Sequence, residues 1–102
     1  MSGKARSYSF TWNNYTSESE VSLKAIEYKY LVYGKEVGDS GTPHLQGMIT
    51  FKNPRAIKAV IKLLKGCHVE VAKDAAALAE YCKKDGDVYE DGDPPLRPQD
   101  GG

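Results

Sequence analysis

The sequence predicts an α+β domain in which helices cover one face of an antiparallel sheet of about five strands. Short segments with alternating apolar and polar residues recur along the chain, and this period of two is typical of strands with one buried face. Between them lie segments whose apolar residues are spaced three and four apart, as on the buried side of a helix. Two strand-like segments follow each other directly in the middle of the chain, which favours an antiparallel sheet.

The first half of the chain predicts three strands and one helix. Alternation over Arg6–Asn13 indicates a strand whose aromatic residues share one face. Ser17–Glu27 predicts a helix, because it opens with the S-x-x-E pattern of a capping box. Tyr28–Glu36 is rich in β-branched and aromatic residues and predicts a strand. After a loop at Gly38–Pro43, His44–Lys52 predicts the next strand.

The second half predicts two further helices. Asn53-Pro54 is a typical helix start, with Asn as the cap and Pro in the first turn, and Gly66 is a typical end. Asp74 predicts the cap of a third helix that runs to about Lys84. The apolar residues predicted to face the core are Ile57, Val60, Ile61 and Leu64 in the second helix and Ala75, Leu78, Ala79 and Cys82 in the third.

Two short strands complete the prediction. Cys67–Val71 lies between the second and third helices, and Asp87–Glu90 follows a turn at Asp85-Gly86. The first six elements then have the split β-α-β order of ferredoxin-like domains, which RNA-recognition motifs share. We therefore expect one sheet face to be free for a ligand.

Charge divides the chain into two parts, although the formal net charge is zero. Residues 1–84 carry 13 Lys and Arg against 8 Asp and Glu, whereas residues 85–102 carry one Arg against six acidic residues. A basic body suits a phosphate backbone, and a merely solvated surface is the alternative. We expect one domain over residues 1–91 and a linker or disordered tail over residues 92–102, which are rich in Pro, Gly and Asp.

Composition argues against several other classes of protein. No stretch approaches the roughly 18 apolar residues of a membrane span, and the N-terminus has no apolar segment like that of a signal peptide. We therefore expect no membrane partner. Cys67 and Cys82 are too few for a disulfide framework, and we expect both to be small buried hydrophobic residues.

One predicted sheet face gathers side chains that suit a divalent cation. His44 and Gln46 alternate onto the polar face of their strand, and Glu36 ends the preceding strand, which a short connection brings back toward His44. A carboxylate, an imidazole and an amide oxygen form a mixed oxygen and nitrogen donor set that suits Mg²⁺ or Mn²⁺. An ordinary surface histidine is the alternative for His44.

Other polar residues allow both a functional and a plain interpretation. Tyr81 and Lys84 lie one turn apart at the edge of the apolar stripe of the third helix, where Tyr81 is either reactive or simply half-buried. Asn13 and Asn14 can contact bases or phosphates, or they only form a turn. His68 and Glu70 share the polar face of a short strand, either solvated or in contact with DNA at the sheet edge.

Together these segments resemble the three motifs of the replication-initiator (Rep) proteins of small circular single-stranded DNA viruses, most closely circoviruses, in the HUH endonuclease superfamily. Phe10–Asn14 matches F-T-x-N-N, Pro43–Gly47 matches P-H-L-Q-G, and Tyr81–Lys84 matches Y-C-x-K. Gly34-Lys35-Glu36 matches a G-x-E that precedes the second motif, and Gly66–Glu70 is also similar to the family. In the second motif, Gln46 stands where H-x-H has its second histidine.

The resemblance implies an HUH fold and a metal-dependent nicking and joining enzyme for single-stranded DNA. Glu36, His44 and Gln46 would then bind Mg²⁺ or Mn²⁺, Tyr81 would be the nucleophile, and Lys84 would help to place the DNA, the active-site water or the metal. The product would be a 5′-phosphotyrosine and a free 3′-hydroxyl that primes rolling-circle replication.

The resemblance also implies a biological context. The substrate would be a viral origin stem-loop, cut in the host nucleus. We expect this chain to be a monomeric nuclease domain whose tail leads toward an absent helicase domain, through which the full protein would form oligomers.

The predicted DNA contacts are spread over several strands, and binding through basic residues such as Lys4 would depend on salt. A non-catalytic binding module of the RNA-recognition type is the main alternative, and a purely structural or interaction domain is the other. The predicted DNA-binding residues are Arg6, Tyr8, Asn13, Asn14, Lys35, His68 and Glu70.

Overall fold

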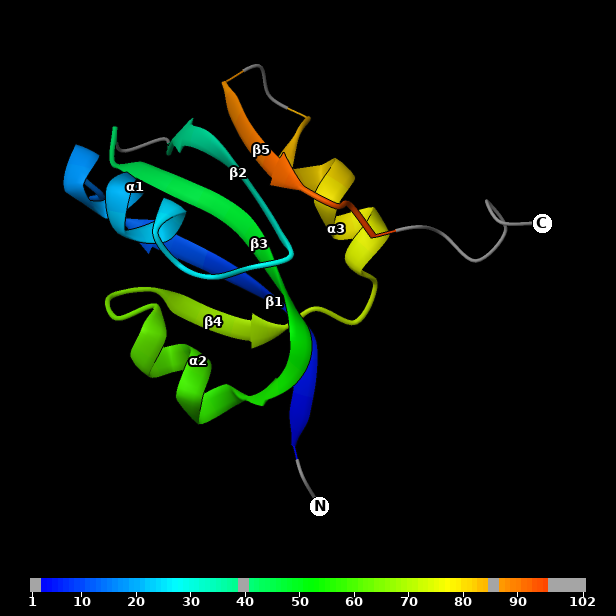
Figure 1. Ribbon diagram of the computed structural model, residues 1–102. Coiled ribbons are helices and arrows are strands. Elements are labelled where there is room, and N and C mark those ends of the chain that lie inside the picture. Colours follow the sequence, from blue (N-terminus) through cyan, green and yellow to red (C-terminus); the bar gives the residue numbers. More distant parts are fainter. Residues whose placement is uncertain (1–2, 39–40, 85–86, 96–102) are drawn as a thin grey trace.

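A five-stranded antiparallel sheet in the order β4-β1-β3-β2-β5 forms the centre of the molecule (Figure 1). The computed structural model describes residues 3–38, 41–84 and 87–95. The predictions of an α+β fold and of an antiparallel sheet of about five strands are confirmed. Along the chain the elements are β1 (Lys4–Asn13), α1 (Ser17–Lys24), β2 (Tyr30–Val37), β3 (Pro43–Ala56), α2 (Ile57–Leu63), β4 (His68–Val71), α3 (Ala75–Cys82) and β5 (Val88–Gly92).

Helices α1 and α2 cover one face of the sheet, as predicted, and enclose the larger core. Leu23 of α1 and Val60 and Leu64 of the α2 segment are buried against aromatic and aliphatic residues of β1, β2 and β3. The predicted stripe of α2 is only partly buried, because Ile61 is exposed. The strand residues of this core are Tyr8, Phe10, Leu31, Tyr33, Leu45, Ile49, Phe51 and Val69.

Helix α3 lies on the opposite face, so the expectation that all helices share one face holds only for α1 and α2 (Figure 1). Ala79 and Cys82 are buried there against Tyr30, Val32 and Met48. These strand residues alternate with the ones that form the larger core, so β2 and β3 are buried on both sides where α3 crosses them. The face expected to be free for a ligand is therefore partly covered.

Tertiary pairing shifts several element boundaries. The helix predicted to open at Asn53-Pro54 begins only at Ile57, because β3 continues to Ala56 and pairs there with the start of β1. Helix α1 is capped by Thr16, with a capping box to Ser19 rather than one opened by Ser17, and it ends at Lys24. The turn predicted at Asp85-Gly86 lies outside the described residues, as do residues 96–102 of the predicted tail.

The cap predicted for the third helix is confirmed, because the Asp74 carboxylate accepts a hydrogen bond from the Ala77 amide at 3.1 Å. Within the described residues, no helix has the length and apolar composition needed to cross a membrane.

Candidate nucleic-acid-cleaving site

Glu36 and His44 face each other across the hairpin formed by β2 and β3. They are direct partners in the antiparallel register, and the imidazole Nε2 donates a hydrogen bond to the carboxylate Oε1 at 3.0 Å. Each side chain is only about one-fifth exposed (21% and 22%), so the pair is sheltered while still open on one side. The structure therefore brings together two of the three side chains predicted to bind a cation.

Gln46 lies on the same face, two residues further along β3 and opposite Gly34 of β2. Among the described residues, no cluster of three or more His, Cys, Asp and Glu could hold a metal ion. A complete site therefore needs the amide oxygen of Gln46 beside the Glu36–His44 pair. This set of one carboxylate, one imidazole and one amide fits a hard divalent cation such as Mg²⁺ or Mn²⁺.

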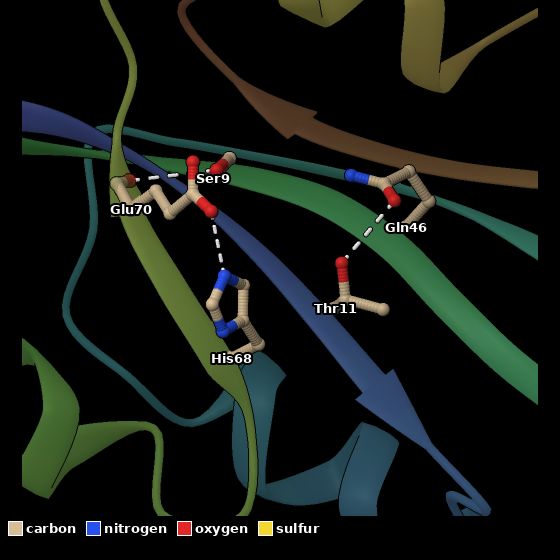
Figure 2. Close-up of polar contacts among 5 residues, drawn as sticks. All are labelled: Ser9, Thr11, Gln46, His68 and Glu70. Atoms are coloured by element: carbon tan, nitrogen blue, oxygen red, sulfur yellow. Dashed lines mark hydrogen bonds and ion pairs between the residues drawn. The ribbon is translucent and has the colours of Figure 1, made fainter.

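Thr11 contacts Gln46 from the neighbouring strand, an interaction that the sequence did not predict (Figure 2). Thr11 and Gln46 are register partners in β1 and β3, and the Thr11 hydroxyl donates to Gln46 Oε1 at 3.2 Å. The hydrogen bond limits rotation of the amide, so Thr11 orients the side chain predicted to be a ligand. The F-T-x-N-N motif contains this threonine, but only the strand register reveals its partner.

Helix α3 crosses the sheet directly over Gly34. A Cβ atom at Gly34 would lie 2.5 Å from the backbone carbonyl oxygen of Cys82, which is closer than van der Waals contact allows. Because Gly34 pairs with Gln46 and Glu36 is the next residue of β2 on that face, the end of α3 lies beside the candidate ligands. Burial, with Glu36 as a smaller electrostatic cause, raises the pKa of Cys82 to about 12.

Tyr81 and Lys84 project from this end of α3. Tyr81 is 48% exposed, so its side chain is accessible to a ligand. The Lys84 ammonium lies 4.4 Å from the centre of the Tyr81 ring, in a cation–π contact. The two residues predicted to be catalytic are therefore in contact with each other, Tyr81 in the last turn of the helix that packs beside Glu36 and Gln46 and Lys84 just after its end.

A second attachment holds the same end of α3 to the edge of the sheet. Lys83 donates to Glu90 of β5 at 3.1 Å, and Glu90 also accepts a hydrogen bond from the buried Tyr30 hydroxyl. The hydrogen bond from Tyr30, followed by the contact with Lys83, lowers the pKa of Glu90. The sequence alone predicted no role for Lys83 or Glu90, since their contact depends on the position of α3.

Asn13 and Asn14 lie at the end of β1 next to this site. Asn13 is the register partner of His44, and both asparagines are exposed. Asn14 has a left-handed backbone conformation (φ 56°). Its backbone N–H donates to the Pro43 carbonyl at 2.8 Å, which fixes the end of β1 to the start of β3. Asn14 thus has the turn role, and both side chains are accessible beside the candidate ligands.

His68 and Glu70 extend the polar face to the sheet edge (Figure 2). On β4 they pair with Thr11 and Ser9 of β1, which places His68, Thr11 and Gln46 in one row across three strands. The His68 imidazole donates to the Glu70 carboxylate at 2.6 Å, and both side chains are largely exposed. The row is polar throughout and leads from Gln46 to the edge strand.

Three other residues predicted to bind DNA lie away from this row. Tyr8 is fully buried in the larger core and its hydroxyl donates to the Arg55 carbonyl, so its predicted DNA contact is wrong for this conformation. Lys35 lies on the opposite face and forms an ion pair with Glu20 of α1 at 3.5 Å, which places it away from the Glu36–His44 pair. Arg6 is exposed at the β1 bulge, away from the Glu36–His44 pair.

Comparison with known proteins identifies a family. Residues 5–85 match the family described as "Putative viral replication protein". The chain is 42% identical over 88 residues to the replication-associated protein of Canary circovirus and 46% identical over 87 residues to that of Beak and feather disease virus. It is also 35% identical over 77 residues to the master replication protein of Banana bunchy top virus.

These matches cover most of this chain but a minor part of each relative. They include 82%, 81% and 74% of the chain, in the order given, and 30%, 30% and 26% of the relatives. The chain therefore spans about a third or less of the length of these relatives.

Proposed function

Because this chain belongs to the family of viral replication proteins, we propose that it is a single-stranded DNA endonuclease that initiates rolling-circle replication of a viral genome. The observation that carries this proposal is the crossing of α3 over Gly34, which brings the Tyr81 end of the helix beside Glu36 and Gln46. The names of the relatives, replication-associated and master replication protein, support the same role.

In the proposed reaction, the Tyr81 hydroxyl oxygen attacks a phosphorus atom of single-stranded DNA. A bond forms between the tyrosine oxygen and phosphorus, and the bond from phosphorus to the 3′-oxygen breaks. The proton lost by the tyrosine is balanced by the proton that the 3′-oxygen gains as it becomes a hydroxyl. Because one phosphodiester replaces another, the step is close to reversible, and the same residues can rejoin the strand.

The chain supplies groups for both positioning and charge stabilisation. Glu36, His44 and Gln46 would hold Mg²⁺ or Mn²⁺, with Thr11 fixing the Gln46 amide. When bound, such a cation stabilises negative charge on a phosphate oxygen and orients the phosphate. Lys84, in contact with the Tyr81 ring, adds a positive charge near the developing phenolate and the phosphate.

A single strand suits this site, because its flexible backbone can turn a phosphate toward Tyr81 more freely than a stiff duplex can. We propose that the strand runs along the row of Gln46, Thr11 and His68 and past the exposed Asn13. The loop of an origin hairpin would present such a strand.

The test is formation of a covalent protein–DNA adduct on a denaturing gel. The protein is mixed with a panel of single-stranded oligonucleotides from circovirus-type origin loops and Mn²⁺, with chelator as one control. Tyr81→Phe should abolish the adduct, whereas Tyr89→Phe, a matched change on the opposite sheet face, should retain it. Loss of adduct only with chelator and with Tyr81→Phe supports the proposal.

A different outcome would favour the alternative. If no oligonucleotide forms an adduct although single-stranded DNA still binds without a divalent cation, the domain is a non-catalytic nucleic-acid-binding module. If the adduct persists in Tyr81→Phe, another residue is the nucleophile and the role given to α3 is wrong.

A further inference from the structure

A group of basic residues lies in a segment that takes no part in the proposed cleavage site. Residues 52–65 contain no Asp or Glu, and within them lie five basic residues of the β3 end and the α2 region. Among the described residues, none of these five forms an ion pair with an acidic side chain. The residues of this basic surface are Lys52, Arg55, Lys58, Lys62 and Lys65.

The geometry of α2 directs its lysines outward. Val60 and Leu64 are buried against the sheet, whereas Lys58, Lys62 and Lys65, spaced four and three residues apart, are exposed. At about 1.5 Å rise per residue, Lys58 and Lys62 lie about 6 Å apart along the helix axis, and Lys65 follows two residues after the helix ends at Leu63. The two helix lysines therefore share the outer side of α2, and Lys65 adds a third positive charge beyond its end.

A surface hollow continues the basic surface beyond the start of α2. It has a volume of about 240 Å³ and is lined by Glu27, Tyr28, Lys52, Asn53 and Arg55. The Arg55 guanidinium is held 4.3 Å from the centre of the Phe51 ring, which limits its motion. One acid, Glu27, is present in the lining, but the two cations and the amide give the hollow a majority of groups that attract phosphate.

The cleavage face differs in charge. Its polar groups include the carboxylates of Glu36, Glu70 and Glu90, and one of its cations, Lys83, is already paired with Glu90. Such a face can position a strand for cleavage, but it offers little net positive charge to attract a polyanion. Most of the electrostatic affinity for DNA therefore has to come from another surface.

We propose that the basic surface of Lys52, Arg55, Lys58, Lys62 and Lys65 binds the phosphate backbone of duplex DNA, a partner distinct from the single strand at the cleavage site. This inference rests on the proposed DNA-cleaving function. Helix α2 packs beside β4, and β4 ends the polar row that carries the strand, so DNA leaving this row at the β4 edge reaches α2 (Figure 1). Single-strand binding surfaces combine cations with exposed aromatic rings. Among the described residues, Tyr81 is the only large aromatic side chain with about half of its surface exposed, and it lies on the other sheet face. The basic surface therefore suits a duplex better than a single strand.

Two apolar side chains, Ile61 and Leu63, are also exposed on α2, and a protein partner would use these. We favour DNA because five cations in an acid-free segment complement a regular array of phosphates. A protein partner is then one of the outcomes that the experiment distinguishes.

The experiment compares two charge-matched double variants by fluorescence anisotropy with a short labelled duplex of arbitrary sequence. Lys58→Gln with Lys62→Gln removes two charges from the basic surface and keeps good helix propensity. Lys24→Gln with Lys35→Gln removes two charges near the opposite edge of the same sheet face. Affinity is measured over a series of salt concentrations, in the absence of divalent cations.

The Lys58 and Lys62 variant should reduce the magnitude of the negative slope of log K against log salt by about 1.8, at about 0.9 for each DNA phosphate that the protein no longer neutralises. The Lys24 and Lys35 variant should leave this slope unchanged. Equal slopes in all three proteins overturn the proposal and leave α2 to a protein partner. Covalent adduct formation with a single strand is measured separately, so a protein that forms the adduct but shows no slope change contradicts only this inference. A slope change without adduct contradicts only the cleavage function.

Discussion

Replacing Gly34 by alanine tests whether the close approach of α3 to the sheet positions the proposed nucleophile. The added Cβ would lie 2.5 Å from the Cys82 carbonyl oxygen, whereas ordinary contact begins at 3.4 Å. The carbonyl must therefore withdraw by about 0.9 Å, and as backbone at the end of α3 it cannot do so without moving the helix. Tyr81 is the preceding residue and has to move with it.

The expected loss of stability is modest, because two effects oppose each other. Overpacking of a well-packed site costs about 1–3 kcal/mol, whereas replacing glycine by alanine in an allowed conformation stabilises by about 0.4–1 kcal/mol through the unfolded chain. The free energy of unfolding should thus fall by about 1–2 kcal/mol. Cleavage should fall much further, because a displacement of about 1 Å at a reacting group can cost about 100-fold in rate.

The assay pairs urea unfolding with the rate of adduct formation at saturating DNA. Gly38→Ala is the matched control, because its Cβ would meet only the Thr42 carbonyl oxygen at an ordinary 3.8 Å. This control should retain both stability and rate. If Gly34→Ala is as stable and as active as Gly38→Ala, the contact at Cys82 does not position α3, and the reasoning that joins the sheet to Tyr81 is refuted.

Three further predictions concern Thr11 and Cys82. Thr11→Val should weaken Mn²⁺ binding about tenfold, measured by calorimetry without DNA, because the loss of the hydroxyl frees the Gln46 amide. Thr11→Ser keeps the hydroxyl and should retain Mn²⁺ binding. Thr50→Val removes a similar hydroxyl contact between β1 and β3 and should leave Mn²⁺ binding unchanged. Burial raises the pKa of Cys82 to about 12, so iodoacetamide should modify it far more slowly in the folded protein than in urea near neutral pH. The thiol of the unfolded chain ionises around its ordinary pKa of 9.0, whereas the folded one stays protonated up to about 12. The free energy of unfolding should therefore fall as pH rises from about 9 toward 12, and Cys82→Ala should reduce that fall.

Local sequence patterns predicted the parts of the fold that depend on neighbouring residues. Alternation along β3 placed His44 and Gln46 on one face, and the short connection to β2 placed Glu36 beside His44. Both features follow from the period of a strand and from the geometry of a hairpin. They need no knowledge of the remaining chain.

The position of α3 could not be derived in this way, because it depends on burial of both sheet faces. The signal was present in β2, where Tyr30, Leu31, Val32 and Tyr33 form a continuous apolar run, as in strands covered on both sides. The helix predicted from Asn53 was displaced for a similar reason, since pairing of Ala56 with β1 outweighs the local preference for a helix start. Distant pairing also determines the Thr11 contact.

The register of the central strands also bears on how the site assembles during folding. The Glu36–His44 contact closes a separation of eight residues, whereas the Thr11–Gln46 contact closes one of 35. By loop-closure entropy the second contact costs about 1.3 kcal/mol more than the first. The β2–β3 hairpin can therefore acquire the carboxylate–imidazole pair as a local event, while orientation of the amide waits for β1 to dock against β3. Conditions that loosen β1 would leave a chain that retains its first two candidate ligands and loses control of the third.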